Sequence, residues 1–335
     1  MFAYILKRLI AGVLVLVMVS MAIFLLFWFG PQEPARPLCD SRTSNRCSPE
    51  RLENFTETLG YNNSWYSEYG KYMKGIALGR DINLGGQTKH CDAPCFGFSY
   101  KTSQSVWDQM KDRIPATFSV AIGGAFLYVV LGVPLGVAAA RRRGTLADKA
   151  LVSSFLVISS VPYYLFALLT WLYFTVIFEV PFISDTGYHP FTDNPATWFS
   201  GLLLAWVALG IFGCTQYTRY SRGAMVEALS EDYIRTAKAK GLLPRTVVYK
   251  HGLRAALVPI VTIFGIDFGT LLAGTIFTER IFEIDGIGYW SLRAVLDKDL
   301  PIVSATALFS ATCLIVSNLL VDVVYSILDP RVRLS

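Results

Sequence analysis

The residues best suited to a specific task begin at Ser230, in a basic segment that separates two long apolar runs. Ser230 can cap a short helix, and Glu231 and Asp232 would occupy its first turn, where acidic side chains meet the positive end of the helix dipole. Basic residues gather toward its end, and Gly241 supplies the left-handed residue that commonly stops a helix. The i,i+4 pair of Glu231 with Arg235 adds only about 0.2–0.5 kcal/mol. We therefore expect a short helix that needs a partner surface to be well ordered.

The sequence contains no arrangement typical of catalysis or nucleotide binding. It has no G-x-x-x-x-G-K-[ST] phosphate loop, so nothing in it is predicted to cradle the phosphates of ATP. The H-E-x-x-H and G-x-S-x-G motifs are also absent, and the three histidines, His90, His189 and His251, are scattered. We expect a chain that is not an enzyme, that holds no metal or other cofactor of its own, and that takes its energy from another protein.

Four cysteines lie in one long polar segment near the N-terminus, namely Cys39, Cys47, Cys91 and Cys95. An even set in an oxidising compartment indicates two disulfides. Three pairings are possible, and the pairs closest in sequence, Cys39 with Cys47 and Cys91 with Cys95, are favoured. A zinc site is the competing interpretation, because Cys91 and Cys95 have metal-like spacing and His90 is adjacent. A third interpretation is that the four cysteines remain unpaired thiols.

The composition places the chain in a membrane, since 53% of its 335 residues are hydrophobic and only 16% are charged. A helix needs about 20 apolar residues to cross about 30 Å of hydrocarbon. Six runs qualify, and we expect spans at residues 9–29, 117–140, 151–178, 199–217, 257–277 and 303–328. The first run is too long for a cleavable signal and lacks a small-residue cleavage site, so we expect it to be retained. Gly132 and Gly136 predict close helix packing, and Pro162 predicts a kink.

Lysine and arginine in the short connections predict the orientation, because they accumulate on the cytoplasmic side. The residues that would share this side are Lys7, Arg8, Arg141, Arg142, Arg143, Lys149, the basic residues between 219 and 254, Arg331 and Arg333. The connection at residues 179–198 has no Lys or Arg. Long loops cross largely regardless of charge, so residues 30–116 do not oppose the assignment. We expect both termini in the cytoplasm and the cysteine-bearing segment outside.

Asp267 lies near the middle of the fifth predicted span. A charge there costs at least about 2.5–3.5 kcal/mol on insertion scales, so the carboxylate should face water, a partner or a pathway. One interpretation is that Asp267 lines a transport route and meets the cationic amino end of a peptide. The other is a hydrogen-bonded or protonated acid that holds helices together. The sequence leaves both open.

Several motifs are similar to those of one family of transport proteins. They are residues 4–9 (Tyr-Ile-Leu-Lys-Arg-Leu), residues 113–117 (Arg-Ile-Pro-Ala-Thr), a partial match at residues 30–34, the loop with Gly286, Gly288, Asp299 and Pro301, and the ending at residues 328–333. The strongest match is residues 232–241 (Asp-Tyr-Ile-Arg-Thr-Ala-Lys-Ala-Lys-Gly), with Leu253 behind it. Nearly end to end, the chain resembles the inner-membrane permease subunits of ABC importers of the dipeptide/oligopeptide/nickel family.

In that family the segment that residues 232–241 resemble forms a coupling helix, which sits in a groove of an ATPase subunit. The resemblance implies this role for Tyr233, Arg235, Ala237, Gly241 and Leu253. The family's Glu-Ala-Ala pattern reads Arg-Thr-Ala at residues 235–237, a departure that leaves the spacing intact. The resemblance also implies a second homologous permease, two cytoplasmic ATPase subunits or domains that bind ATP and magnesium, and an extracytoplasmic substrate-binding protein. Membrane lipid is expected around the chain, and nucleic acid is not an expected partner.

We therefore predict an all-α polytopic membrane protein with six transmembrane helices and a disulfide-bearing extracytoplasmic insert. Its parts are the amino-terminal tail and first helix (residues 1–29), the insert (30–116), and a five-helix core (117–335) with a cytoplasmic coupling loop (219–256). The resemblance implies half of a peptide pathway in a bacterial inner membrane, coupled to a separate ATPase. The same architecture importing nickel, glutathione or another small solute is the alternative, and a passive channel or assembly factor is the alternative of another class.

Overall fold

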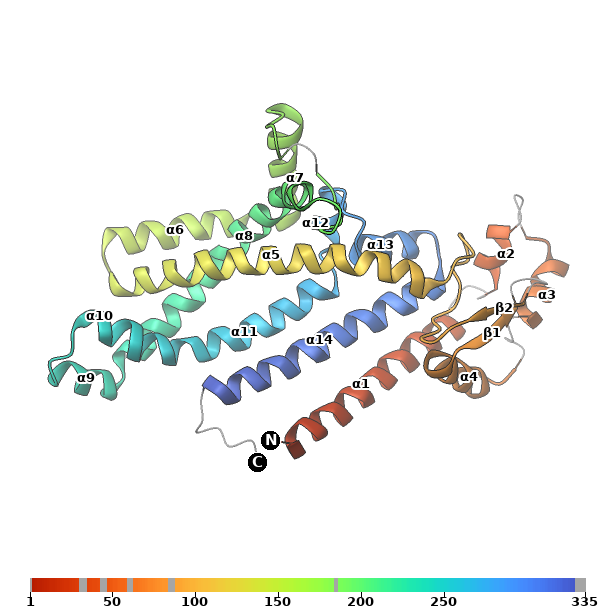
Figure 1. Cartoon of the computed structure of the whole chain (residues 1–335), viewed down its shortest axis with the longest axis horizontal. Helices are drawn as coiled ribbons and strands as arrows, with labels where there is room; N and C mark the ends of the chain where they lie inside the picture. Colours follow the sequence, from red (N-terminus) through yellow and green to blue (C-terminus); the bar gives the residue numbers. More distant parts are fainter. Residues whose placement is uncertain are drawn as a thin grey trace. The chain divides into compact units, whose positions relative to one another are not determined.

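The computed structural model (Figure 1) describes residues 2–29, 35–42, 47–58, 63–83, 88–183 and 186–328. The motif matches at residues 30–34 and 329–333, with Arg331 and Arg333, lie outside the described residues. Within them the chain is almost entirely helical, and its strands form a two-stranded sheet. The predicted all-α class is confirmed.

Five of the described helices are long and apolar enough to cross a membrane. They are α1 (Phe2–Trp28), α5 (Val106–Arg141), α8 (Pro195–Ser230), α11 (Leu253–Ala273) with the turns before it, and α14 (Leu300–Leu328). α6 (Leu146–Ser160) and α7 (Tyr163–Trp171), which continues into the π-helical turn η1 (Leu172–Ile177), meet the same test as a bent pair. With this pair counted as one span, each of the six predicted spans has its counterpart.

The third span departs most from a straight helix. α6 and α7 meet at an angle of 88°. Val161 and Pro162 form the joint, and their ψ angles of 131° and 135° are extended. Proline has no N–H to continue a helix, and its ring disfavours a helical conformation in the residue before it. The predicted kink at Pro162 is therefore a complete break.

Shorter elements connect the long helices. Before α5 lie α2 (Arg36–Arg42), α3 (Pro49–Thr58), α4 (Trp65–Leu78) and the antiparallel strands β1 (Arg80–Asn83) and β2 (Thr88–Cys91). Between α8 and α11 lie α9 (Asp232–Ala239), α10 (Pro244–Thr246) and the π-helical turn η2 (Val247–Gly252). α12 (Ile276–Ile281) and α13 (Ile287–Leu296) precede α14.

The chain divides into two compact units. The first consists of Met1–Tyr4, Ala116–Asp285 and Leu314–Ser335, and the second of Ile5–Pro115 and Gly286–Cys313. The helices α5 and α14 each contribute residues to both units. The predicted division into residues 1–29, 30–116 and 117–335 stays a prediction.

In the first unit, α5 and α8 pack closely along their length. A Cβ atom on Gly132 would lie 2.6 Å from the Cβ of Tyr217, and one on Gly136 would lie 2.6 Å from the Cβ of Ser221. Only glycine permits such an approach between helix backbones. The close packing predicted for Gly132 and Gly136 is confirmed.

In the second unit, two disulfides close short loops. Cys39 of α2 is joined to Cys47, and Cys91, the last residue of β2, is joined to Cys95. These are the pairs that the sequence favours. The zinc alternative is left without thiolate ligands because Cys91 and Cys95 are bonded to each other.

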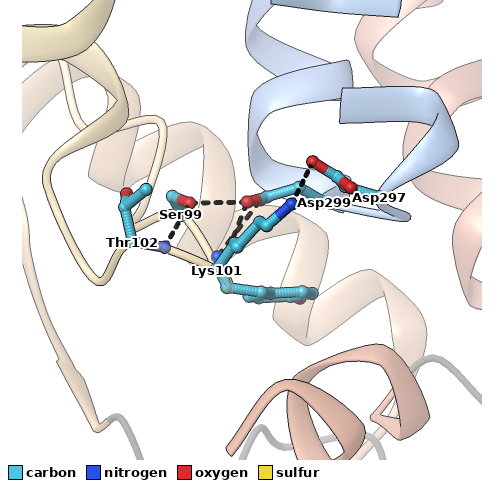
Figure 2. A network of polar contacts seen from close by, with 6 residues as sticks. Ser99, Lys101, Thr102, Asp297 and Asp299 are labelled. Atoms are coloured by element: carbon cyan, nitrogen blue, oxygen red, sulfur yellow. Dashed lines mark hydrogen bonds and ion pairs between the residues drawn. The ribbon is translucent and has the colours of Figure 1, made fainter. Parts of the chain in front are cut away.

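A buried carboxylate joins distant parts of the second unit (Figure 2). Asp299, directly before α14, accepts hydrogen bonds from the Oγ of Ser99 (2.5 Å) and from the backbone N–H groups of Tyr100 (3.2 Å) and Lys101 (3.3 Å). Asp299 is only 2% exposed, and these donors offset the cost of removing its charge from water. Beside it, the Nζ of Lys101 lies 2.8 Å from the Oδ2 of Asp297 at the surface.

Candidate functional site

The basic loop between α8 and α11 contains the predicted short helix, α9. Glu231 occupies its N-cap position and makes no side-chain cap bond. The prediction that Ser230 caps this helix is wrong, because Ser230 is the last residue of α8 and its hydroxyl donates to the carbonyl of Glu227 (2.7 Å). Arg235 pairs with Asp232 at i,i+3 (3.2 Å) in place of the expected i,i+4 partner. Both side chains are exposed, so the pair adds little stability.

Gly241 ends the helix as predicted. Its φ angle is +72°, in the left-handed region. The N–H of Gly241 donates to the carbonyl of Lys238 (3.0 Å), and that of Leu242 donates to the carbonyl of Ala237 (3.3 Å). These two bonds form a Schellman motif. Among the described residues, no atom lies within 4 Å of a Cβ built on Gly241, so backbone conformation and not space selects glycine.

One face of α9 packs against its neighbours. Ile234 is fully buried and Ala237 is nearly so, and they form one apolar cluster with Val247 of η2, against which Leu229 of α8 packs. The i,i+3 spacing of Ile234 and Ala237 places them on the same side of the helix. Ala237 therefore has a packing role in this structure, and the position of α9 is fixed by apolar contacts with two elements.

The opposite face of α9 and the turn after it are exposed. Tyr233 is 44% exposed and Leu243 is 72% exposed. Exposed basic residues surround them, namely Arg235, Lys238, Lys240, Arg245, Lys250 and Arg254. Large apolar side chains exposed among charged ones are typical of a surface that binds another protein.

Both ends of the loop are attached closely to long helices. At one end a single residue, Glu231, separates α9 from α8. At the other, α10, η2 and α11 follow one another without a break. Gly252 lies against α8, since a Cβ there would be 2.9 Å from the Cδ2 of Leu229. Leu253 packs on the apolar cluster that includes Met225. α9 is therefore joined closely to both α8 and α11.

A buried ion pair joins α8 to α6. The Oδ1 of Asp148 lies 2.6 Å from the Nε of Arg222, and its Oδ2 lies 2.7 Å from the Nη2. The N–H of Gly144 also donates to Oδ2 (2.9 Å). Asp148 is 3% exposed and the side chain of Arg222 is 29% exposed, so the carboxylate of this bidentate pair is removed from water and the guanidinium only partly so. No motif in the sequence pointed to this pair. The available signal was Thr145, three residues before Asp148, because that spacing is typical of a helix N-terminus.

The structure places the predicted site residues in two groups. Tyr233, Arg235 and Gly241 are exposed, whereas Ala237 packs against η2 and α8, and Leu253 packs on the apolar cluster of α5 and α8. The division was not evident from the spacing of the motif. Their role in binding an ATPase stays a prediction.

Asp267 lies on α11, where three long helices meet. Its Oδ2 accepts a hydrogen bond from the hydroxyl of Tyr217 on α8 (2.9 Å). Tyr217 in turn stacks on Tyr128 of α5, with ring centroids 4.5 Å apart. The hydrogen bond supports the interpretation that this acid joins helices, and the pathway role stays a prediction.

Two family profiles match most of the chain. Residues 132–334 match the family described as binding-protein-dependent transport system inner membrane component. Residues 1–121 match the family described as the N-terminal part of the binding-protein-dependent transport system membrane component. The first match includes the whole basic loop.

The chain is similar over its full length to known permease proteins. It is 31% identical over 330 residues to a probable peptide ABC transporter permease protein of Sinorhizobium fredii, covering 98% of this chain and 99% of the relative. A putative peptide transport system permease protein of Brucella abortus is 32% identical over 333 residues, covering 99% of each chain. The dipeptide transport system permease protein DppB of Escherichia coli K12 is 31% identical over 356 residues, again covering 99% of each.

The long apolar helices and the exposed basic loop define a multi-pass membrane protein. The profiles and the full-length relatives show that the chain belongs to the family of binding-protein-dependent transport inner-membrane components, the permease subunits of ABC transporters. The resemblance found in the sequence is confirmed.

Proposed function

We propose that this chain is the permease subunit of an ATP-driven peptide importer and forms half of its transmembrane pathway. The support is that the relatives from Sinorhizobium, Brucella and Escherichia are named for peptide or dipeptide transport. The chain makes and breaks no bond in its substrate. Partner subunits bind ATP and magnesium and hydrolyse the nucleotide.

The observation that carries this proposal is the geometry of α9. An ATPase subunit contacts the exposed face with Tyr233, Arg235 and the turn at Gly241, while Ala237 and Leu253 hold the loop on the long helices. A short helix that is packed on one face and exposed on the other can transmit displacement of a partner. When the ATPase pair closes, α9 moves with it, and the spans alternate between inward and outward exposure.

The assembly contains a second homologous permease, two cytoplasmic ATPase subunits or domains, and an extracytoplasmic substrate-binding protein. The loop at residues 219–256 and both termini face the cytoplasm, in accordance with the distribution of lysine and arginine. The disulfide-bearing insert lies outside, in a compartment where disulfides persist.

Asp267 lines the pathway in this proposal. It is only partly buried within the subunit, and Tyr217 donates to its Oδ2, whereas its Oδ1 has no donor among the described residues. That oxygen can accept a hydrogen bond from the ammonium group of a peptide. The Asp267→Asn variant should raise the KM for a free dipeptide more than for its N-acetylated form. Equal changes for both substrates would assign Asp267 to helix packing alone.

The coupling role is tested by replacing Gly241 with valine. A β-branched residue is strained at φ +72° by about 1–3 kcal/mol, which should displace the turn that ends α9. The matched control is Gly144→Val, because Gly144 also has a positive φ (+83°) and open space around it. Uptake and ATP hydrolysis are measured in proteoliposomes that contain all subunits. We expect Gly241→Val to lower peptide uptake per ATP about tenfold, with normal insertion, and Gly144→Val to change this ratio much less.

Unaltered coupling in Gly241→Val, with the complex assembled, would contradict the proposal.

The substrate class is tested separately by offering a dipeptide, glutathione and nickel ions to the same proteoliposomes with the cognate binding protein. Uptake of the dipeptide is expected. If only glutathione or nickel were taken up, the chain would still be a permease subunit, but its substrate would not be a peptide.

A further inference from the structure

A hollow of about 160 Å³ lies within the second unit, away from the basic loop in sequence. The end of α1, the start of α14, α4, β1 and the segment at residues 96–100 line it. In Figure 1, α4 lies beside the end of α1, and the hydroxyl of Tyr69 on α4 donates to the carbonyl of Val17 on α1 (3.1 Å). Much of its wall is aromatic, and the aromatic lining residues are Phe24, Phe27, Trp28, Tyr72, Phe96, Phe98 and Tyr100.

Arg80 brings a positive charge into this aromatic hollow. Its Nε is buried and has no hydrogen-bond acceptor among the described residues. Its guanidinium carbon lies 5.6 Å from the centre of the Tyr72 ring, within the range of a cation–π contact. The Arg80 stem packs against Gly75, where a Cβ would lie 2.6 Å from the Cδ of Arg80. The backbone of α4 is therefore shaped to admit this side chain.

Glu68 acts on Arg80 through its charge, but the two side chains share no hydrogen bond in the described part of the chain. Glu68 also lines the hollow, but its Oε1 accepts from the Nζ of Lys71 (2.6 Å) and from the Nδ2 of Asn63 (2.9 Å). Burial is the main cause that lowers the pKa of Arg80, and the guanidinium still remains protonated at neutral pH. Arg80 is partly buried, and a cation in such a place without a hydrogen-bonded anion is costly unless a ligand supplies one.

The walls indicate which anion fits. α1 and α14 are candidate membrane spans, and Ile23, Leu300 and Leu308 add aliphatic surface beside the aromatic rings. A guanidinium binds a phosphate through parallel N–H donors, and aromatic side chains gather where a bilayer meets water. Phosphate combined with an apolar chain is the chemistry of a phospholipid. The carboxylate of a free peptide would use the charge but not the aliphatic wall.

We propose that this hollow binds one phospholipid, with its phosphate on Arg80 and the start of an acyl chain against the aromatic wall. The orientation assigned under the proposed function places the lipid in the outer leaflet, because the end of α1 and the start of α14 then face outward. The binding itself does not depend on that orientation or on transport, so the two can fail separately.

The test measures lipid binding to the purified chain by native mass spectrometry, with soluble dihexanoyl phosphatidylglycerol as the probe. Arg80→Gln removes the charge from the hollow, and Arg51→Gln removes an exposed charge from α3 as the matched control. We expect Arg80→Gln to weaken the one-lipid complex about tenfold or more, because a charge-assisted hydrogen bond is lost. The lipid affinity of Arg51→Gln should be within about twofold of that of the unaltered chain.

Three outcomes would overturn the proposal. The first is equal lipid binding by Arg80→Gln and Arg51→Gln. The second is inorganic phosphate binding as tightly as the lipid, which would make the site a free-anion site. The third is tighter binding of a dipeptide such as Ala-Ala than of the lipid. Should Arg80→Gln fail to fold, Arg80→Lys keeps the charge without the paired donors, and an unchanged lipid affinity in that variant would count against a phosphate held by the guanidinium.

Discussion

The basic loop and the cysteine-bearing insert are stabilised in opposite ways. The insert has two disulfides, and it is joined to α14 by the buried carboxylate of Asp299, whose hydrogen-bond donors all come from the same unit. The loop at residues 219–256 has no cysteine, and α9 is held by a few apolar side chains on one face. The insert is held by disulfides and hydrogen bonds within its own unit, whereas one face of α9 stays exposed.

This difference can be measured with the two buried free thiols. Cys214 belongs to the first unit and Cys313 to the second. A thiol-reactive dye added during thermal unfolding labels each thiol when its surroundings open. With Cys313 replaced by alanine the dye reports the first unit, and with Cys214 replaced it reports the second.

The largest expected effect on stability comes from the ion pair beneath the loop. Asp148→Ala leaves the partly buried guanidinium of Arg222 without its bidentate partner. Breaking a fully buried pair costs about 3–5 kcal/mol, and the partial exposure of Arg222 places the expected loss in the lower part of that range. The Cys214 thiol should therefore react at a clearly lower temperature. Asp232→Ala is the control, since it breaks the fully surface-exposed pair with Arg235 and should change little. If both variants lost similarly little stability, the ion pair between Asp148 and Arg222 would not stabilise the first unit as proposed.

The next effect concerns the polar network of the second unit. Asp299→Ala removes an acceptor shared by three donors and leaves the buried hydroxyl of Ser99 without it, so we expect a loss of about 3 kcal/mol, read at Cys313. The neighbouring change Asp297→Ala breaks only the exposed pair with Lys101 and should cost no more than about 1 kcal/mol. Equal losses for the two aspartates would mean that burial of Asp299 carries no special weight.

Removing a disulfide should have a smaller and more local effect. The double variant Cys39→Ser with Cys47→Ser opens a loop with a sequence separation of 8, which corresponds to about 2.5 kcal/mol in the chain-entropy description. The temperature at which the dye labels Cys313 should fall. The labelling temperature of Cys214 and the ratio of uptake to ATP hydrolysis should stay the same. A comparable fall at Cys214 would show that the two regions are not stabilised independently.

The smallest expected effect is pH-dependent. The hydrogen bond from His90 to Asp81 across β1 and β2 raises the pKa of His90, and the charge of Asp81 adds to this. A raised pKa means that the contribution is fully present below the unfolded value near 6.5 and is lost as pH rises through the folded pKa. Hydrogen exchange of the β1–β2 amides, corrected for intrinsic rates, should report more opening at high pH. Asp81→Asn should reduce the difference to the smaller contribution of Asp92, whose Oδ1 lies 3.6 Å from the Nε2 of His90, and an unchanged pH response in this variant would assign it to another group.

The features that the sequence predicts well are local. The apolar runs, the left-handed stop at Gly241 and the pairing of Cys91 with Cys95 each depend on residues close in the chain. Ser230 was predicted wrongly because α8 extends through it, and its hydroxyl bonds to the preceding turn. The angle between α6 and α7 at Pro162 depends on the residues against which each helix packs, and these contacts are not evident from the sequence.

The features that the sequence could not predict are those that join distant residues. Asp148 and Arg222 are 74 residues apart, and Ser99 and Asp299 are 200 residues apart. With one sequence, neither pair has a signal that connects its members. The motif likewise identified the residues of α9 but not their two faces, because Ala237 is buried by Val247, which follows ten residues later.

The most direct test of the central claim is the location and partner of Lys238, which is exposed on α9. With Cys214 and Cys313 replaced by alanine, Lys238→Cys is compared with Leu296→Cys, whose side chain is exposed at the end of α13. We predict that a membrane-impermeant maleimide labels Leu296→Cys in intact cells, and labels Lys238→Cys only after the membrane is permeabilised. A short cross-linker should then join Lys238→Cys to the ATPase subunit of the assembled complex. Labelling of Lys238→Cys from outside, or the absence of any cross-link to the ATPase, would contradict the account.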